Sequence, residues 1–93
     1  MHAVLIEVDV RGVDPEHGLT TLRDQIVPMI SNMPGFDSGA WLPGNDEGRG
    51  LSLTVWASRD DAQRMADTFG PNSSPAAGAS VVRCEVREVA VKL

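Results

Sequence analysis

The chain has 93 residues, of which 42% are hydrophobic and 23% charged, and its formal net charge is −5 at pH 7. A chain of this length buries roughly 60 to 65% of the surface that its unfolded state exposes, which is enough for one modest core. We therefore expect residues 1–93 to form a single domain. The negative charge opposes attraction to nucleic acids and anionic membranes, so neither is expected as a partner.

The sequence holds one cysteine, Cys84, and two histidines, His2 and His17. A single cysteine cannot form an internal disulfide, and the first residues lack the apolar run of a signal peptide, so a cytoplasmic location is expected. No apolar run approaches the ~20 residues that span a membrane. Because the histidines do not recur with the spacing of metal ligands, we expect no metal, no cofactor and no Ser-His-Asp or Cys-His nucleophile.

The first half of the chain predicts a strand, a helix and a second strand. Residues 3–10 alternate with the period of a strand, and the face opposite the apolar one carries Leu5, Glu7 and Asp9. A helix is expected to begin at Pro15, after an Asp14 N-cap, and to bend at Pro28 before it ends at "MPGF". Residues 36–43 then predict the second strand.

The second half repeats this order. Residues 50–57 predict a third strand in a hairpin with the second, and Ser58 predicts the N-cap of a helix that ends at Gly70. Residues 71–80 predict an irregular, mobile loop, and the last strand is expected to start near Val81. Beyond Glu88 its apolar positions slip by one residue, which indicates either a bulge at residues 87–88 or a tail that crosses onto a partner subunit; we favour the partner.

The third strand, "GLSLTVWAS", carries aliphatic residues on one face and hydroxyls with a tryptophan on the other. We expect the aliphatic face to pack under the helices and the polar face to line a half-polar cavity. The aliphatic face consists of Leu51, Leu53, Val55 and Ala57, and the polar face of Ser52, Thr54 and Trp56.

The order strand, helix, strand, strand, helix, strand predicts an α+β, ferredoxin-like split βαβ fold. In this fold a four-stranded antiparallel sheet of order 4-1-3-2 carries both helices on one face. With "MPGFDSGAWL" after the first helix and "LSLTVWASRDDAQ" leading into the second, nearly the whole chain resembles the dimeric α+β barrel superfamily, and within it the antibiotic-biosynthesis-monooxygenase-like proteins. The resemblance implies a homodimer in which two sheets pack open face to open face.

The open face is therefore where a site is expected. Glu7 or Asp9 should lie within reach of Arg83 or Arg87, because the first and fourth strands are neighbours in this topology. We favour the interpretation that these pairs are salt bridges that orient the dimer. The alternative is catalytic: a desolvated Glu7 would act as a base while Arg83 or Arg87 stabilises an enolate or phenolate oxygen.

The candidate substrate-binding residues are expected beside these groups. They are Trp41, Ser52, Thr54, Trp56 and Asp9. For both tryptophans, interface packing and ligand stacking are equally open interpretations. Cofactor-free oxygenase relatives carry an Asn, Trp and Arg constellation, in which Trp56 and Arg83 or Arg87 would take two parts, with Ser52 or Thr54 in place of the Asn. Haem-degrading relatives carry a first-strand Asn and a later His, whereas this chain has Glu7 and no His after His17.

These observations predict a small-molecule-binding homodimer that acts on an aromatic or polyketide-like substrate. The resemblance implies a cofactor-independent monooxygenase or an isomerase. The alternative is a non-catalytic dimeric binding or stress-associated protein, whose open face is filled by the partner's side chains. An internal cavity would distinguish the two.

Overall fold

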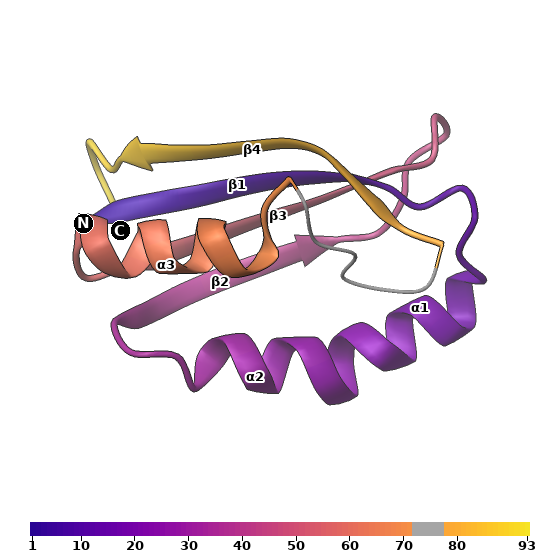
Figure 1. Ribbon diagram of the computed structural model, residues 1–93, viewed down its shortest axis with the longest axis horizontal. Coiled ribbons are helices and arrows are strands. Elements are labelled where there is room, and N and C mark those ends of the chain that lie inside the picture. The colour runs from indigo at the N-terminus through magenta and orange to yellow at the C-terminus, as the bar shows by residue number, and fades with distance from the viewer. Residues whose placement is uncertain (72–77) are drawn as a thin grey trace.

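The computed structural model describes residues 1–71 and 78–93 (Figure 1). Its elements are β1 (His2–Asp9), α1 (Pro15–Thr21), η1 (Leu22–Ile26), α2 (Val27–Ser31), β2 (Phe36–Leu42), β3 (Arg49–Trp56), α3 (Arg59–Phe69) and β4 (Ser80–Glu88). The strands form one antiparallel sheet in the order β2-β3-β1-β4, with the helices on one of its faces. The predicted α+β, ferredoxin-like fold and its strand order are confirmed.

The first helical segment runs without a break from α1 through η1 to α2. Asp14 caps it as predicted, because its Oδ1 accepts the backbone N–H of Glu16 at 3.2 Å. In η1 the chain makes a π-helical turn, in which the N–H of Val27 donates to the carbonyl of Leu22. Pro28 has no backbone N–H, and its ring would crowd the carbonyl four residues earlier in a regular α-helix. The wider turn directly before Pro28 accommodates the ring, and the bend expected at Pro28 stays a prediction.

The core lies between the sheet and the helices, and α3 supplies much of its cover. Ser58 caps α3 as predicted: its Oγ accepts the backbone N–H of Asp61 at 3.1 Å. The buried core cluster consists of Val4, Ile6, Ile30, Trp56, Ala62, Met65 and Ala66. Cys84 packs against this cluster from β4, and burial raises the pKa of its thiol.

Strand β3 faces the opposite way from the prediction. Val4 pairs with Thr54 and Ile6 with Ser52 across the two strands, and directly opposed residues share a face of the sheet. The polar face of β3 (Ser52, Thr54, Trp56) therefore lies under the helices. The aliphatic residues Leu51, Leu53 and Val55 lie on the open face, where Leu53 is 43% exposed. The prediction was wrong because it assigned the more uniformly aliphatic set to the core.

The buried polar pair on β3 satisfies itself. The Nε1–H of Trp56 donates to Oγ1 of Thr54 at 2.9 Å, and both side chains are completely buried. Trp56 also makes an edge-to-face contact with Phe36, with ring centroids 5.5 Å apart. An indole can occupy a core when its one donor finds a partner, and Thr54 provides that partner.

In β4 the register shift lies elsewhere than predicted. It falls between Glu7 and Val8, which pair with Arg83 and Val81, whereas the pairing of β1 with β4 stays regular from Glu7 back to the start of β1. The backbone N–H of Val89 donates to the carbonyl of Met1 at 3.0 Å before the chain leaves the sheet. A bulge at residues 87–88 is thus wrong, and the crossing of the tail onto a partner stays a prediction. Most of the predicted loop 71–80 lies outside the described residues.

Candidate ligand pocket

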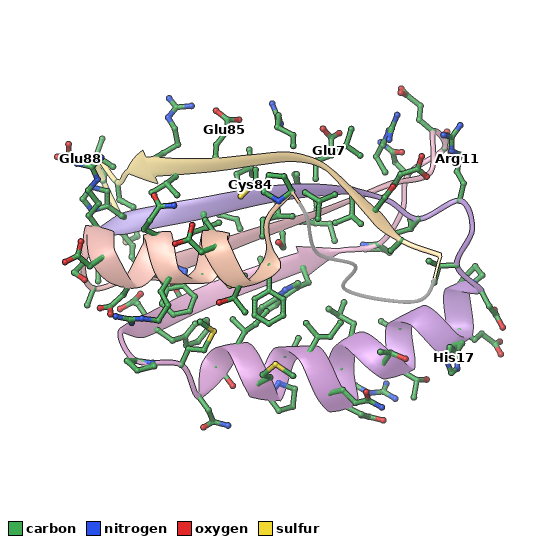
Figure 2. All side chains as sticks on the ribbon, in the orientation of Figure 1. Glu7, Arg11, His17, Cys84, Glu85 and Glu88 are labelled. Atoms are coloured by element: carbon green, nitrogen blue, oxygen red, sulfur yellow. The ribbon has the colours of Figure 1, made fainter. Side chains whose placement is uncertain are left out.

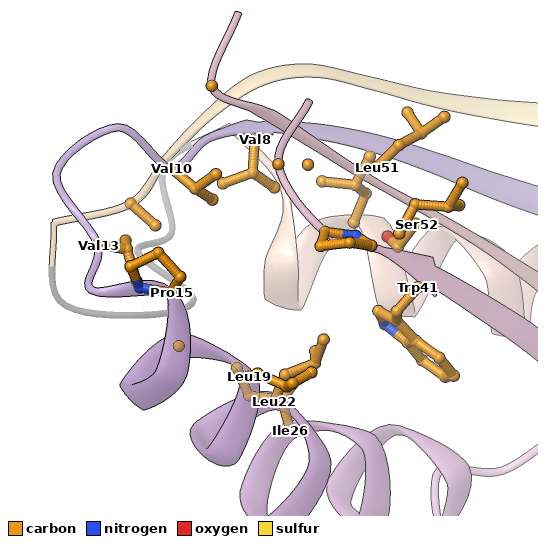
Figure 3. Close-up of a pocket in the computed structure, with 18 of the residues that line it drawn as sticks. Val8, Val10, Val13, Pro15, Leu19, Leu22, Ile26, Trp41, Leu51 and Ser52 are labelled. Carbon is orange, nitrogen blue, oxygen red and sulfur yellow. The ribbon is translucent and has the colours of Figure 1, made fainter. Parts of the chain in front are cut away.

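A pocket of about 520 Å³ opens between the helix-facing side of the sheet and the α1–η1 segment (Figure 3). Its walls come from β1, β2, β3, all parts of the first helical segment and the end of α3. Apolar residues make up most of the lining: Ile6, Val8, Val10, Val13, Pro15, Leu19, Leu22, Ile26, Ile30, Trp41, Leu42, Pro43, Leu51, Met65, Phe69 and Ala79. Leu42 and Leu51 pair with each other and alternate with Trp41 and Ser52, so the register directs their side chains to the open face. An apolar concave site with a few polar groups is typical of small-molecule binding.

The pocket exists because one end of the helical layer does not pack tightly on the sheet. None of the residues of α1 or η1 is buried, and Leu19, which lines the pocket, is 55% exposed. On the sheet, Val8 pairs with Gly50, which carries no side chain to fill the space. At the other end of the same face, Trp56 is completely buried in the core.

Two polar side chains belong to the pocket wall near the core. Ser52 is 9% exposed, and its strand partner on β2 is Trp41, so the two lie side by side. The six-membered ring of Trp41 lies over Gly39, where a Cβ atom would come within 2.8 Å of Cη2 of the indole. Gly39 therefore allows the indole to lie flat along the strand, next to Thr54.

At the rim of the pocket, Arg11 is held by a neighbouring carboxylate. Its guanidinium donates to both oxygens of Asp9, at 3.1 Å from Nε to Oδ1 and 2.6 Å from Nη2 to Oδ2. Arg49 approaches the same carboxylate at 3.4 Å. The hydrogen bonds from Arg11 are the main reason that the pKa of Asp9 falls to about 2. Asp9 is thus an ionised partner for two arginines next to the pocket.

The remaining predicted residues lie on the open face of the sheet. Arg83 approaches Glu7 at 3.6 Å and Glu85 at 3.4 Å, and Arg87 approaches Glu85 at 3.3 Å. The neighbourhood predicted for Glu7 and Arg83 is confirmed. Figure 2 shows Glu7 and Glu85 on the side of the sheet away from the helices, whereas Cys84 points toward α3.

The sheet therefore divides the predicted site. Trp41 and Ser52 come together in the pocket, and Asp9 is bonded to Arg11 at its rim. Thr54 and Trp56 lie in the core beside the pocket, and Glu7, Arg83 and Arg87 lie on the other face of the sheet. Their predicted common location is wrong, and their predicted roles stay predictions. Sequence reasoning missed the pocket wall at residues 10–13 and 19–26, because it expected the cavity on the open face of the sheet.

Within residues 1–71 and 78–93, no group of three or more His, Cys, Asp or Glu side chains is placed to hold a metal ion. None of the helices that the structure describes is long and apolar enough to cross a membrane.

No family model matches the sequence, and no curated protein matches it significantly. Solved structures do match. SnoaB of Streptomyces nogalater, described as a cofactor-independent oxygenase, is 17% identical with a TM-score of 0.74, over 99% of this chain and 95% of that one. The monooxygenase ActVA-Orf6 of Streptomyces coelicolor, solved with the ligand nanaomycin D, is 13% identical with a TM-score of 0.63, over 99% and 90% of the two chains.

The haem degrader MhuD of Mycobacterium tuberculosis, solved with two haems bound, is 19% identical with a TM-score of 0.60, over 100% of this chain and 99% of that one. Sequence identities this low do not show that this chain shares an activity with these proteins. The structural matches cover nearly the whole chain, so the whole chain shares their fold. The chain therefore has the fold of the antibiotic-biosynthesis-monooxygenase-like proteins, as its sequence resemblance predicted.

Proposed function

We propose that this protein binds a flat aromatic or polyketide-like molecule in the pocket and oxidises it as a cofactor-independent monooxygenase. The observation that carries the proposal is the apolar pocket of about 520 Å³ inside the fold. Pockets that enclose small organic ligands typically measure ~300 to 1,000 Å³. The indole of Trp41 adds a flat wall against which an aromatic ring can stack.

The likeness in fold to SnoaB and ActVA-Orf6 supports oxygenase chemistry in such a pocket. Without a cofactor, the substrate itself must supply the electrons that reduce O₂. When a ring methylene becomes a carbonyl, two C–H bonds break, one oxygen atom enters the product and the other leaves as water. A molecule that ionises readily at such a carbon meets this requirement, and an apolar pocket excludes water from the reacting centre.

Binding can be tested by tryptophan emission during titration with nanaomycin D. Trp41 lines the pocket and Trp56 does not, so the two Trp→Phe variants are matched controls. We expect saturable quenching in the wild type and in Trp56→Phe, and its loss in Trp41→Phe. Haemin is titrated in parallel, because MhuD is described with bound haem. Absence of quenching by any compound in the wild type would contradict the proposed pocket function.

Turnover can be tested with anthrone, which carries an oxidisable ring methylene. We expect oxygen uptake above the uncatalysed rate, with one anthraquinone formed for each O₂ consumed. The matched variant is Leu22→Trp, which would fill the pocket from η1 and should abolish both binding and uptake. Binding without oxygen uptake would instead favour the non-catalytic binding protein.

We further propose that the working unit is a cytoplasmic homodimer joined through the open face of the sheet. Leu42 and Leu53 are exposed on this face, and burying them against a second copy would be favourable. The face also alternates in charge along β4, from Arg83 through Glu85 to Arg87. A surface with both signs can be complementary to itself across a two-fold axis.

A further inference from the structure

We infer that Arg11 binds a carboxylate group of the ligand at the mouth of the pocket. The inference rests on the proposed pocket function and narrows its substrate to an aromatic or polyketide-like carboxylic acid. Such a molecule would place its ring system in the apolar body of the pocket and its negative charge at the rim.

Arg11 gives the pocket wall its charge. Among the described residues that line the pocket, it alone carries a charged side chain. The acidic residues of the neighbouring turns, Asp14, Asp46 and Glu47, do not line the pocket, although the whole chain has a formal net charge of −5. The pocket of this acidic protein therefore presents a positive group to its ligand, which favours an anion at that place.

Asp9 and Gly48 hold the Arg11 side chain in position. The carboxylate of Asp9 accepts from Nε of Arg11 at 3.1 Å, from Nη2 at 2.6 Å and from the backbone N–H at 3.0 Å. The aliphatic stem of Arg11 packs on Gly48, where an added Cβ atom would clash with Cγ of the arginine. Because these contacts already order the side chain, binding an anion costs little further conformational entropy.

The same contacts leave part of the guanidinium available to a ligand. Nε and Nη2 are bonded to Asp9, whereas Nη1 donates to none of the described residues. Arg49 lies 3.4 Å from the same carboxylate, which is ionised, so the three side chains together carry one positive charge. A ligand carboxylate that accepts from Nη1 would neutralise this charge without displacing Asp9.

Asn45, which also lines the pocket, offers a second donor nearby. Its Oδ1 accepts the backbone N–H groups of Glu47 and Arg49, and its carbonyl accepts the N–H of Gly48, on which Arg11 packs. Its Nδ2 donates to none of the described residues. An amide N–H and a guanidinium N–H can each donate to a carboxylate oxygen.

The rim suits a charged group better than the apolar interior does. The Arg11 side chain is 68% exposed, so a carboxylate bound to it keeps part of its hydration. Figure 3 shows Val10 and Val13 at one end of the pocket and Trp41 at the other. Arg11 lies between the two valines in the sequence, so a ligand with its ring against Trp41 and its carboxylate at Arg11 would lie along the pocket.

The test compares 2-naphthoate with its methyl ester, which has the same ring system and no charge, in the wild type and in Arg11→Gln. Dissociation constants are measured by equilibrium dialysis at neutral pH. We expect the wild type to bind the acid more tightly than the ester. The ratio of acid to ester affinity should fall about fivefold or more in Arg11→Gln, the effect of one charge-assisted hydrogen bond. Unchanged ester affinity shows that the pocket of the variant is intact.

Arg23→Gln is the matched control. Arg23 pairs with a neighbouring carboxylate, that of Asp24 at 3.3 Å, and its side chain is 67% exposed, but it does not line the pocket. The control therefore removes the same charge from an equally exposed site, and it should leave the ratio of acid to ester affinity unchanged. An equal fall in both variants would overturn the inference, because it would reflect net charge alone.

Salt dependence gives a second readout in the wild type. The net charge of −5 repels an anion, so added NaCl would strengthen binding of the acid if no cation contacted it. Contact with Arg11 reverses the sign, and we expect NaCl to weaken binding of the acid but not of the ester. Tighter binding of the acid in salt, or an unchanged affinity ratio in Arg11→Gln with both compounds bound, would overturn the inference and leave the proposed pocket function intact. Failure of both compounds to bind the wild type would overturn both.

Discussion

The two faces of the sheet use polar side chains in opposite ways. Under the helices, Thr54 and Trp56 are completely buried and satisfy each other with a hydrogen bond of 2.9 Å. On the open face, Glu7 and Arg83 pair at 3.6 Å among exposed leucines. Polarity along a strand therefore does not tell which face is buried. A single donor with a partner is compatible with a core, and exposed aliphatic residues are compatible with an interface.

The helix-facing side of the sheet also has two halves that differ in how closely the helices pack on it. Around Trp56 the helices pack on the sheet without a gap, whereas near Gly50 they leave the pocket. At one end, α3 covers a closed core on the sheet. The loosely packed α1–η1 segment at the other end then encloses space for a ligand.

The largest effect is expected for Trp56→Ala. Removing this fully buried indole also removes its contact with Phe36 and should lower the free energy of unfolding by about 3–5 kcal/mol. Urea or thermal unfolding measures the loss. Trp41→Ala is the control: that side chain is only partly buried, beside an existing pocket, and should cost clearly less. Equal losses for the two variants would mean that the two halves of this face do not differ in packing.

A smaller effect is expected for Thr54→Val, which keeps the shape of the side chain and deletes the acceptor of the Trp56 N–H. A buried donor without a partner costs about 1–3 kcal/mol, and urea unfolding should show this loss. Ser52→Ala, on the same face but without a protein partner in the described chain, should be close to neutral. If Thr54→Val proved neutral as well, the hydrogen bond would have no role in stabilising the core.

On the open face, Leu53→Glu should weaken self-association rather than folding. The side chain is 43% exposed, so the free energy of unfolding of one subunit should change little. A carboxylate buried at the proposed dimer interface should raise the dimer dissociation constant at least tenfold, which is about 1.4 kcal/mol. Sedimentation velocity measures this. Met29→Glu, at a helix position that is 56% exposed, should leave association unchanged. A monomeric wild type would refute the homodimer.

The smallest effect is expected for Glu7→Gln. The carboxylate pairs with Arg83 at a half-exposed site on the opposite face from the pocket, and such pairs contribute at most about 1 kcal/mol to stability. Ligand affinity and oxygen uptake should therefore match the wild type. A loss of turnover with ligand binding intact would instead restore Glu7 as a base and move the active site to the open face.

The sequence by itself determined the elements, their order and their ends. Asp14 and Ser58 cap helices through bonds to residues two or three positions away, and alternation over eight residues marks β1 as a strand. These signals are local, so they can be interpreted from a short stretch of chain. The ferredoxin-like topology then followed from the element order, because few connections between such elements are sterically favourable.

Only the tertiary structure decided which face of β3 is buried and where the pocket lies. Both faces of β3 contain large apolar side chains, so their burial depends on the register with β1, where Val4 meets Thr54 and Ile6 meets Ser52. A shift of that register by one residue would exchange the two faces. The pocket likewise depends on how closely the α1–η1 segment approaches Gly50. Both properties arise from contacts between segments that are far apart in the sequence, which no local pattern encodes.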